Sequence, residues 1–140
     1  MTKKKILVVD DERPISMLIE FNLKLVGFEV HCVHDGEAVF NAIHSFRPDL
    51  IVLDLMLPKM DGIQVCRALR ERNNLVPIIM LTAMQDLSDK IAGLDNGADD
   101  YMTKPFSPQE LISRIQAILR RIQALPSQAE EPPLTIGQIV

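Results

Sequence analysis

The residues in this 140-residue chain that could do chemistry are polar side chains, each of which follows a short apolar run. They are Asp10, Asp11, Asp54, Thr82 and Lys104. Clustered carboxylates repel one another, and a hard divalent cation or a lysine stabilises such a group. A carboxylate held in this way can attack phosphorus, while lysine neutralises the transferring group and a hydroxyl donates a hydrogen bond to it. The pattern therefore predicts phosphoryl transfer to Asp54 with a metal ion present.

The apolar runs before these residues are predicted to be strands of a parallel sheet. Residues 6–9, 50–53 and 77–81 are rich in Ile, Leu and Val, as expected for strands buried on both faces. Weaker strands are predicted at 28–33 and 100–103. In open α/β sheets, ligands bind at the edge formed by the carboxyl ends of the strands. We therefore expect the polar residues to meet at that edge.

Five amphipathic helices are expected to alternate with these strands. They run from Pro14 to a stop at Gly27, from Gly36 (capped by Asp35) to about Phe46, from Asp61 to about Arg72, from Asp86 onward, and from Ser107 to Ile122. The helix after Asp86 has a single narrow apolar stripe, so we expect it to be the least firmly held. The alternation predicts an α/β fold with a doubly wound five-stranded parallel sheet, strand order 2-1-3-4-5, which is flavodoxin-like.

Composition excludes several classes of protein. A formal net charge of -4, no Trp and a single Tyr argue against direct nucleic-acid binding by these residues. No apolar run approaches the ~20 residues that span a bilayer, so we expect no membrane segment. Cys32 and Cys66 lack metal or redox spacing and are expected to be reduced thiols of a cytoplasmic protein.

The composition changes after residue 124. Residues 126–133 form a polar, proline-containing stretch, and residues 134–140 alternate like a strand but are too few to fold alone. We expect residues 1–124 to form one domain. Residues 125–140 are then expected to be a linker and the first residues of a truncated second domain.

The expected metal is Mg²⁺, which prefers oxygen ligands in octahedral geometry and keeps several waters. Asp11 and Asp54 are each expected to supply one oxygen, and Asp10 to act directly or through water. The backbone carbonyl of Met56, two positions after Asp54, is a further candidate ligand. The remaining positions suit water and a phosphoryl oxygen.

Five blocks of this sequence resemble the response-regulator receiver domain. They are Ile6–Glu12 (ILVVDDE), Pro48–Pro58 (PDLIVLDLMLP), Asp61-Gly62, Leu81-Thr82-Ala83 and Gly97–Phe106 (GADDYMTKPF). The resemblance implies that a sensor histidine kinase phosphorylates Asp54 and that Asp10 and Asp11 are the acidic pair at the metal. It also implies that Thr82 and Tyr101 are switch residues, that Lys104 is the phosphate-binding lysine, and that the bond before Pro105 is cis.

The C-terminal part resembles the OmpR/PhoB subfamily of winged-helix transcription factors. The resemblance rests on Asp99-Asp100-Tyr101, Lys104-Pro105-Phe106, Glu110-Leu111, Arg114 and Arg120-Arg121. It implies a regulator that binds DNA only through a C-terminal winged-helix domain, of which residues 134–140 resemble the opening strand.

The same resemblance implies that phosphorylation produces a homodimer. The interface would use the helix after Asp86, the last strand and the last helix, with charged pairs and some apolar contacts. The residues expected there are Lys90, Ile91, Leu94, Asp95, Asp99, Asp100, Glu110 and Arg114. Gln116 departs from the pattern, because relatives often have a basic residue at that position.

We expect a phosphoacceptor and not an enzyme that turns over substrate. Met56 and Met84 lie two positions after Asp54 and Thr82, and a thioether cannot position an attacking water, so slow hydrolysis of the aspartyl phosphate is expected. One alternative is a haloacid-dehalogenase-like phosphatase, but there the nucleophile precedes the acidic pair in the chain. The other is a receiver-like binding module that is never phosphorylated.

Overall fold

The computed structural model of the chain describes residues 3–83 and 97–124. This part of the chain contains five strands and four helices. The strands are β1 (Lys5–Val9), β2 (Glu29–Val33), β3 (Leu50–Asp54), β4 (Ile78–Ala83) and β5 (Asp100–Lys104), and the helices are α1 (Arg13–Leu25), α2 (Ala38–Phe46), α3 (Gly62–Glu71) and α5 (Pro108–Ala124). The helix predicted after Asp86 and the predicted linker and second-domain start at 125–140 lie outside the described residues.

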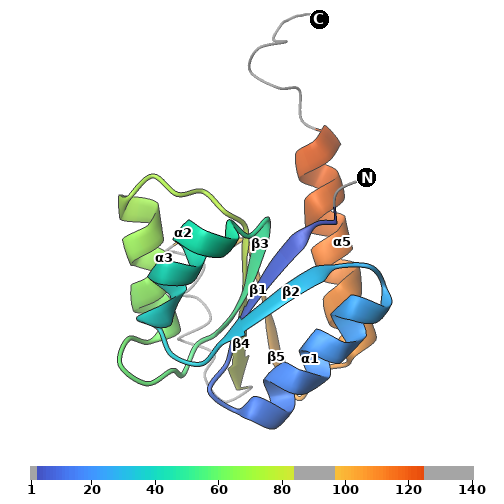
Figure 1. Cartoon of the computed structure of the whole chain (residues 1–140), viewed down its shortest axis with the longest axis horizontal. Coiled ribbons are helices and arrows are strands. Elements are labelled where there is room, and N and C mark those ends of the chain that lie inside the picture. The colour runs from blue at the N-terminus through green and yellow to red at the C-terminus, as the bar shows by residue number, and fades with distance from the viewer. Residues whose placement is uncertain (1–2, 84–96, 125–140) are drawn as a thin grey trace, which may run out of the picture.

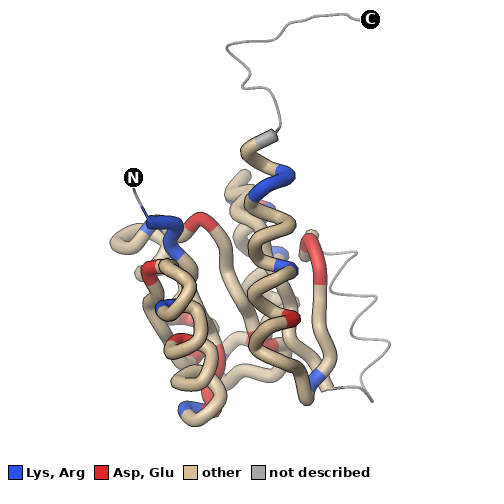
Figure 2. The backbone as a smooth tube through the Cα atoms, turned by 90° about the vertical axis from the view of Figure 1, so that its right-hand side faces the viewer, with Lys and Arg blue, Asp and Glu red and all other residues tan. Residues whose placement is uncertain are grey.

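The five strands form one parallel sheet in the order β2-β1-β3-β4-β5, which confirms the predicted topology (Figure 1). Asp54 pairs with Leu81, and Ala83 pairs with Lys104. This register places the ends of β3, β4 and β5 at one edge of the sheet. The basic run at the start of β1 (blue, beside the N-terminus in Figure 2) belongs to the opposite edge.

The central strands are buried on both faces because successive side chains point to opposite sides. Val8, Val52 and Leu81 pack in a cluster with α1 and α5. Leu7, Ile51 and others pack in a second cluster with α2 and α3. Figure 1 shows the resulting three layers, with α1 and α5 on one face of the sheet and α2 and α3 on the other.

The helix boundaries follow the predicted signals closely. Asp61 and Gln64 form the expected capping box at the start of α3, with reciprocal bonds of 2.9 and 3.0 Å. The Ser107 hydroxyl accepts the N–H of Glu110 at 3.3 Å. Helix α2 begins at Ala38, two residues later than predicted, although the Asp35 carboxylate does accept the Ala38 N–H at 2.9 Å. The Asp35 carboxylate therefore caps the N–H of the first residue of α2, although Asp35 lies three residues before that helix.

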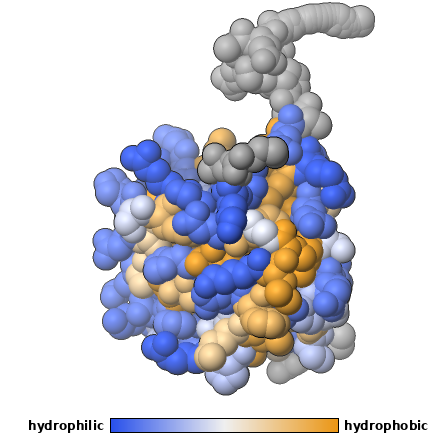
Figure 3. All heavy atoms as spheres, turned by 45° about the vertical axis from the view of Figure 1, so that its right-hand side comes forward, coloured by the Kyte–Doolittle hydropathy of each residue, from blue (hydrophilic) through white to orange (hydrophobic). Residues whose placement is uncertain are grey.

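Helix α1 buries a narrower face than its sequence suggests. Ser16, Ile19 and Leu23 are the buried residues. Several large apolar side chains of this helix and its end are exposed instead, namely Met17 (66%), Leu18 (48%), Phe21 (63%), Leu25 (69%) and Val26 (48%). Figure 3 shows a band of hydrophobic side chains on the side of the molecule where α1 and α5 lie. Contiguous exposed apolar patches are typical of sites that bind a partner.

Within residues 3–83 and 97–124, no helix has the length and hydropathy needed to cross a membrane. Neither Cys32 nor Cys66 is in a disulfide bond. Burial, together with the neighbouring Glu20 carboxylate, raises the pKa of Cys32 to about 12. Burial also raises the pKa of Cys66. A raised pKa keeps both thiols in the protonated, less reactive form at neutral pH.

Candidate functional site

The carboxyl edge of the sheet brings together two carboxylates and one lysine from three different strands. Asp10 follows β1, Asp54 is the last residue of β3, and Lys104 is the last residue of β5. Lys104 Nζ lies 3.3 Å from Oδ2 of Asp10 and 3.3 Å from Oδ2 of Asp54. The convergence that the sequence predicted for these three residues is therefore present.

Burial makes this group electrostatically unusual. The exposed fraction is 0% for Asp10 and 4% for Asp54. Burial, followed by the charge of Asp10, raises the pKa of Asp54 to about 6, against the opposing effects of Lys104 and of the Met56 N–H. Burial alone would lower the pKa of Lys104, but the charges of Asp54 and Asp10 outweigh it and raise that pKa. The lysine is thus fully charged at neutral pH.

A third carboxylate, Glu12, joins the group and was not singled out from the sequence. Its Oε1 lies 3.3 Å from Lys104 Nζ. The signal for it was its position, directly after Asp10 and Asp11 in one acidic run. The N–H of Glu12 donates to Oδ1 of Asp10 at 2.9 Å, so the chain turns here and returns the Glu12 side chain to the site.

The donor set fits a hard divalent cation. Asp10, Glu12 and Asp54 each offer a carboxylate oxygen, and these oxygens lie within 4.8 Å of one another. Three carboxylates face a single lysine, so negative charge is in excess. Mg²⁺ is the common cation that prefers such all-oxygen sites. These residues would hold the ion, and the ion would supply charge neutralisation for an incoming phosphoryl group.

The other two predicted metal ligands lie close by but outside this cluster. The Asp11 side chain is exposed and lines the adjoining cavity. The N–H of Met56 donates to Oδ1 of Asp54 at 3.3 Å, and its side chain is 65% exposed. Direct coordination by Asp11 and by the Met56 carbonyl therefore stays a prediction.

A cavity of about 380 Å³ opens directly onto the acidic cluster. Its walls are Asp11, Glu12, Asp54, Met56, Ala83 and Lys104. The residues come from four separate segments, each at the end of a strand. Such a space admits a phosphoryl group with its metal ion and waters, and it leaves Asp54 accessible from one side although the residue is almost completely buried.

Close backbone packing holds Asp54 from behind. A Cβ atom at Gly62 would lie 2.6 Å from the Asp54 carbonyl oxygen, so only glycine fits at the start of α3. The N–H of Gly62 donates to the carbonyl of Leu55 at 2.8 Å. The Asp61-Gly62 pair seen in the sequence therefore caps α3 and packs closely against the end of β3.

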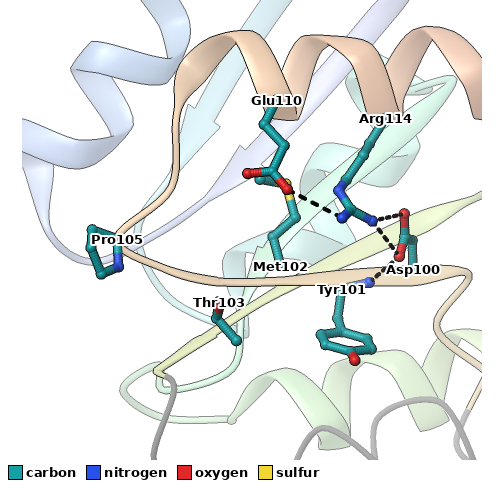
Figure 4. Close-up of a pocket in the computed structure, with 7 residues that line it drawn as sticks. All are labelled: Asp100, Tyr101, Met102, Thr103, Pro105, Glu110 and Arg114. Atoms are coloured by element: carbon teal, nitrogen blue, oxygen red, sulfur yellow. Dashed lines mark hydrogen bonds and ion pairs between the residues drawn. The ribbon is translucent and has the colours of Figure 1, made fainter.

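The predicted switch residues Thr82 and Tyr101 lie on one face of the sheet. Thr82 is 1% exposed, and its hydroxyl donates to the Ala83 carbonyl at 3.4 Å. Tyr101 pairs with Met80 in the register and packs against the cluster that includes α3. In Figure 4 the Tyr101 ring points away from Arg114, on the other side of β5. The bond between Lys104 and Pro105 is cis, as predicted.

The described residues of the predicted dimer face are paired within the chain. Arg114 Nη1 lies 2.9 Å from Oδ2 of Asp100, and Nη2 lies 3.2 Å from Oε2 of Glu110 (Figure 4). Asp99 pairs with Arg70 of α3 at 3.1 Å. Lys90, Ile91, Leu94 and Asp95 lie outside the described residues.

Comparison with known proteins identifies relatives that match nearly all of the described chain. Residues 6–116 match the family model of the response regulator receiver domain. The chain is 52% identical over 138 residues to the alkaline phosphatase synthesis transcriptional regulatory protein PhoP of Bacillus subtilis. The aligned region covers 98% of this chain and 58% of PhoP. The chain thus spans little more than half the length of that relative.

Solved structures give the same result. The receiver domain of the Francisella response regulator 1452 is 38% identical with a TM-score of 0.81, covering 86% of this chain and 99% of that one. The chemotaxis response regulator CheY4 of Vibrio cholerae is 31% identical with a TM-score of 0.78, covering 84% and 99%.

Proposed function

The chain belongs to the response regulator receiver domain family, and on that premise we propose that Asp54 accepts a phosphoryl group from a sensor histidine kinase in the presence of Mg²⁺. The observation that carries the proposal is the environment of Asp54. Its carboxylate is buried, lies 3.3 Å from Lys104, and opens onto a cavity beside Asp10 and Glu12.

The residues divide the chemistry between them. An oxygen of Asp54 forms the new P–O bond while the P–N bond to the kinase imidazole breaks, and the electron pair of that bond stays on the imidazole nitrogen. Lys104 stabilises charge on the phosphoryl oxygens. Since the pKa of Asp54 is about 6, the carboxylate is ionised and nucleophilic at neutral pH. Asp10, Asp54, Glu12 or Asp11, and the Met56 carbonyl are the residues that would hold the metal ion.

We assign the protein the role of a phosphoacceptor that promotes its own phosphorylation and loses the group slowly. Met56 is exposed at the mouth of the cavity, where its thioether cannot orient a water for attack on the aspartyl phosphate. Met84, the other residue expected to contribute, lies outside the described part of the chain. A long-lived phosphoryl group suits control of transcription.

The exposed apolar face of α1 supports a helical kinase partner. Met17, Phe21 and Leu25 recur every four residues and therefore line one side of this helix. An apolar groove of about 430 Å³ connects the start of α1 to Lys104, Pro105 and neighbouring residues at the site. A kinase helix lying on this surface would present its phosphohistidine to the cavity.

We further propose that phosphorylation changes the surface made by β5, α5 and the helix predicted after Asp86, and that the chain then forms a homodimer. Thr82 and Tyr101 lie on the same face of the sheet, which supports a coupled movement when Thr82 turns toward the phosphoryl group. Asp99, Asp100, Glu110 and Arg114 would then exchange internal pairs for pairs across the dimer.

The output is proposed to be control of transcription in the cytoplasm. The name of the PhoP relative describes a transcriptional regulatory protein, and this chain spans 58% of it. DNA binding is assigned to a winged-helix domain after residue 124, of which residues 134–140 would be the first strand. The receiver itself is acidic and would not bind DNA directly.

The central test is the intact mass after incubation with a small phosphodonor and Mg²⁺. The parent chain should gain one phosphoryl group, and Asp54→Asn or removal of Mg²⁺ should abolish the gain. Asp49→Asn is the matched control, because Asp49 lies at the opposite edge of the sheet and accepts the Lys5 N–H at 2.7 Å. An unmodified parent would favour a receiver-like module that is never phosphorylated, and an adduct on Asp54→Asn would place the site elsewhere.

The dimer is tested by size-exclusion chromatography with light scattering, with and without beryllofluoride as a phosphoryl mimic. We expect the parent to double its mass with the mimic. Arg114→Ala should weaken this response several-fold, whereas Arg67→Ala on α3 should leave it unchanged. A mass that stays the same with the mimic would remove support for the proposed interface.

A further inference from the structure

Loop 55–61, which joins β3 to α3, carries the backbone groups nearest to the proposed phosphoacceptor. The Met56 N–H donates to Oδ1 of Asp54 at 3.3 Å. The carbonyl of the same residue is the additional oxygen expected for the metal ion. The position of this loop therefore determines how the Asp54 carboxylate is oriented and whether the oxygen set is complete.

The turn between β2 and α2 contacts three consecutive residues of this loop. The Gly36 N–H donates to the Pro58 carbonyl at 3.4 Å. Lys59 Nζ lies 3.7 Å from Oδ2 of Asp35. A Cβ atom at Gly36 would lie 2.0 Å from the Met60 carbonyl oxygen, far inside van der Waals contact. Only glycine therefore permits the turn and the loop to approach this closely.

The loop has a backbone conformation that needs such support. Lys59 has a φ of 71°, in the left-handed region that non-glycine residues seldom adopt. Conformations of this kind persist where the surrounding structure fixes them. The support comes from both sides, since Met60 packs against the core cluster shared by α2 and α3 while Gly36 covers its carbonyl.

We propose that Gly36 is a positioning residue for the metal and phosphoryl site. It does not touch the site itself. Its close approach to Met60 holds loop 55–61 so that the N–H and carbonyl of Met56 face Asp54. This inference rests on the proposed function, because it assumes that Mg²⁺ binds beside Asp54.

The test compares Gly36→Ala with Gly27→Ala in the full chain. A Cβ atom at Gly27 would meet no atom within 4 Å, but its φ of 100° makes alanine unfavourable there, so this control lowers stability without touching the loop. Mg²⁺ affinity is measured by calorimetry at a temperature where circular dichroism shows every variant folded. Hydrogen exchange of the Met56 and Leu57 amides reports the loop directly.

Gly36→Ala should weaken Mg²⁺ binding at least fivefold and speed exchange of both amides, whereas Gly27→Ala should change neither by more than twofold. Equal effects of the two variants, or an unchanged Mg²⁺ affinity for Gly36→Ala, would overturn the proposal. If Gly36→Ala does not fold, Lys59→Gly replaces it. Glycine relieves the left-handed backbone and frees the loop, so Mg²⁺ binding should fall about threefold or more without loss of thermal stability, and unchanged binding would contradict the proposal.

The parent chain separates this inference from its premise. If the parent binds no Mg²⁺, or if Asp54→Asn binds it equally well, the proposed function fails before any glycine variant is compared. If the parent binds Mg²⁺ and Gly36→Ala binds it as tightly, only the positioning role of Gly36 is lost.

Discussion

The two edges of the sheet arrange charge in different ways. At the carboxyl edge, Lys104 is shared by three carboxylates, and each contact is 3.3 Å long. At the amino edge, Arg70 has one carboxylate partner, Asp99, and donates four further hydrogen bonds of 2.7–3.0 Å to three backbone carbonyls. Asp99 also accepts the Ile78 N–H at 2.8 Å.

The two groups therefore differ in whether their charges and hydrogen bonds are already satisfied. Arg70 is balanced in charge and saturated in hydrogen bonds, so nothing further is needed there. The Lys104 cluster has more negative than positive charge and long contacts, so its energy falls when a cation arrives. A balanced ion pair stabilises the fold, whereas an excess of buried negative charge lowers stability and is typical of a site that binds a cation or other ligand.

The largest expected effect is at the balanced edge. Arg70→Ala removes five hydrogen bonds and leaves the partly buried carbonyls of Gly97, Asn74 and Val76 without this donor. Because lost bonds to a charged group are costly and not additive, we expect a loss of about 2–4 kcal/mol in the free energy of unfolding by urea. Arg121→Ala, which truncates an exposed arginine in the last turn of α5, should cost less than a third of this. Equal losses would show that the hydrogen bonds of Arg70 contribute no more to stability than an exposed arginine does.

At the Lys104 cluster we expect a substitution to raise stability, not to lower it. Asp54→Asn should stabilise the metal-free protein at neutral pH by about 1–2 kcal/mol, because it removes a buried charge whose pKa the fold raises. The pKa of Asp54 is raised from 3.8 to about 6, so the folded state binds more protons in this window and the parent loses stability as pH rises through it. The advantage of the variant should therefore be small below pH 4 and full above pH 6.

Urea unfolding of both proteins across this pH range, in EDTA, checks the second prediction. If the difference in free energy of unfolding between the two proteins did not change with pH, the ionisation of Asp54 would not be what lowers the stability of the parent. A destabilised variant at pH 7 would mean that the ion pair with Lys104 outweighs burial and the charge of Asp10, and the contrast between the two edges would no longer hold.

The sequence predicted the site where each residue directly follows a buried strand. Asp54 and Lys104 were found because parallel strands end at one edge, and this rule depends only on burial and topology. Glu12 was missed because it lies three residues beyond its strand and returns through a local turn, whose path depends on the hydrogen bond between its N–H and Asp10. The rule that residues following parallel strands lie close together does not predict the path of such turns.

The Arg70 network could not be predicted for a related reason. Three of its acceptors are backbone carbonyls, which every residue possesses, so no side-chain pattern marks them. The outward apolar residues of α1 were equally ambiguous, because helical periodicity predicts that a face exists but not how wide the covering sheet and α5 make it. Packing between elements determined both features.

The smallest expected effect concerns Glu12, the exposed member of the acidic cluster. Its side chain is 58% exposed, so water screens its charge, and Glu12→Gln should stabilise the metal-free protein by only a few tenths of a kcal/mol. The gain should disappear in high salt, whereas that of Asp54→Asn should persist. Urea titrations at two salt concentrations measure this, and a gain as large as that of Asp54→Asn would mean that exposure does not distinguish the two carboxylates.

The distance in sequence between the partners of Lys104 has a consequence for biosynthesis. The lysine is 94 residues from Asp10 and 50 from Asp54, and it is the last residue of β5, the final strand among the described residues. Contacts between such distant residues form late in folding, because closing long loops carries the largest entropy loss. A nascent chain that has not released β5 from the ribosome has its acidic residues but no cation to balance them. The proposed site should therefore be complete only when β5 has joined the sheet.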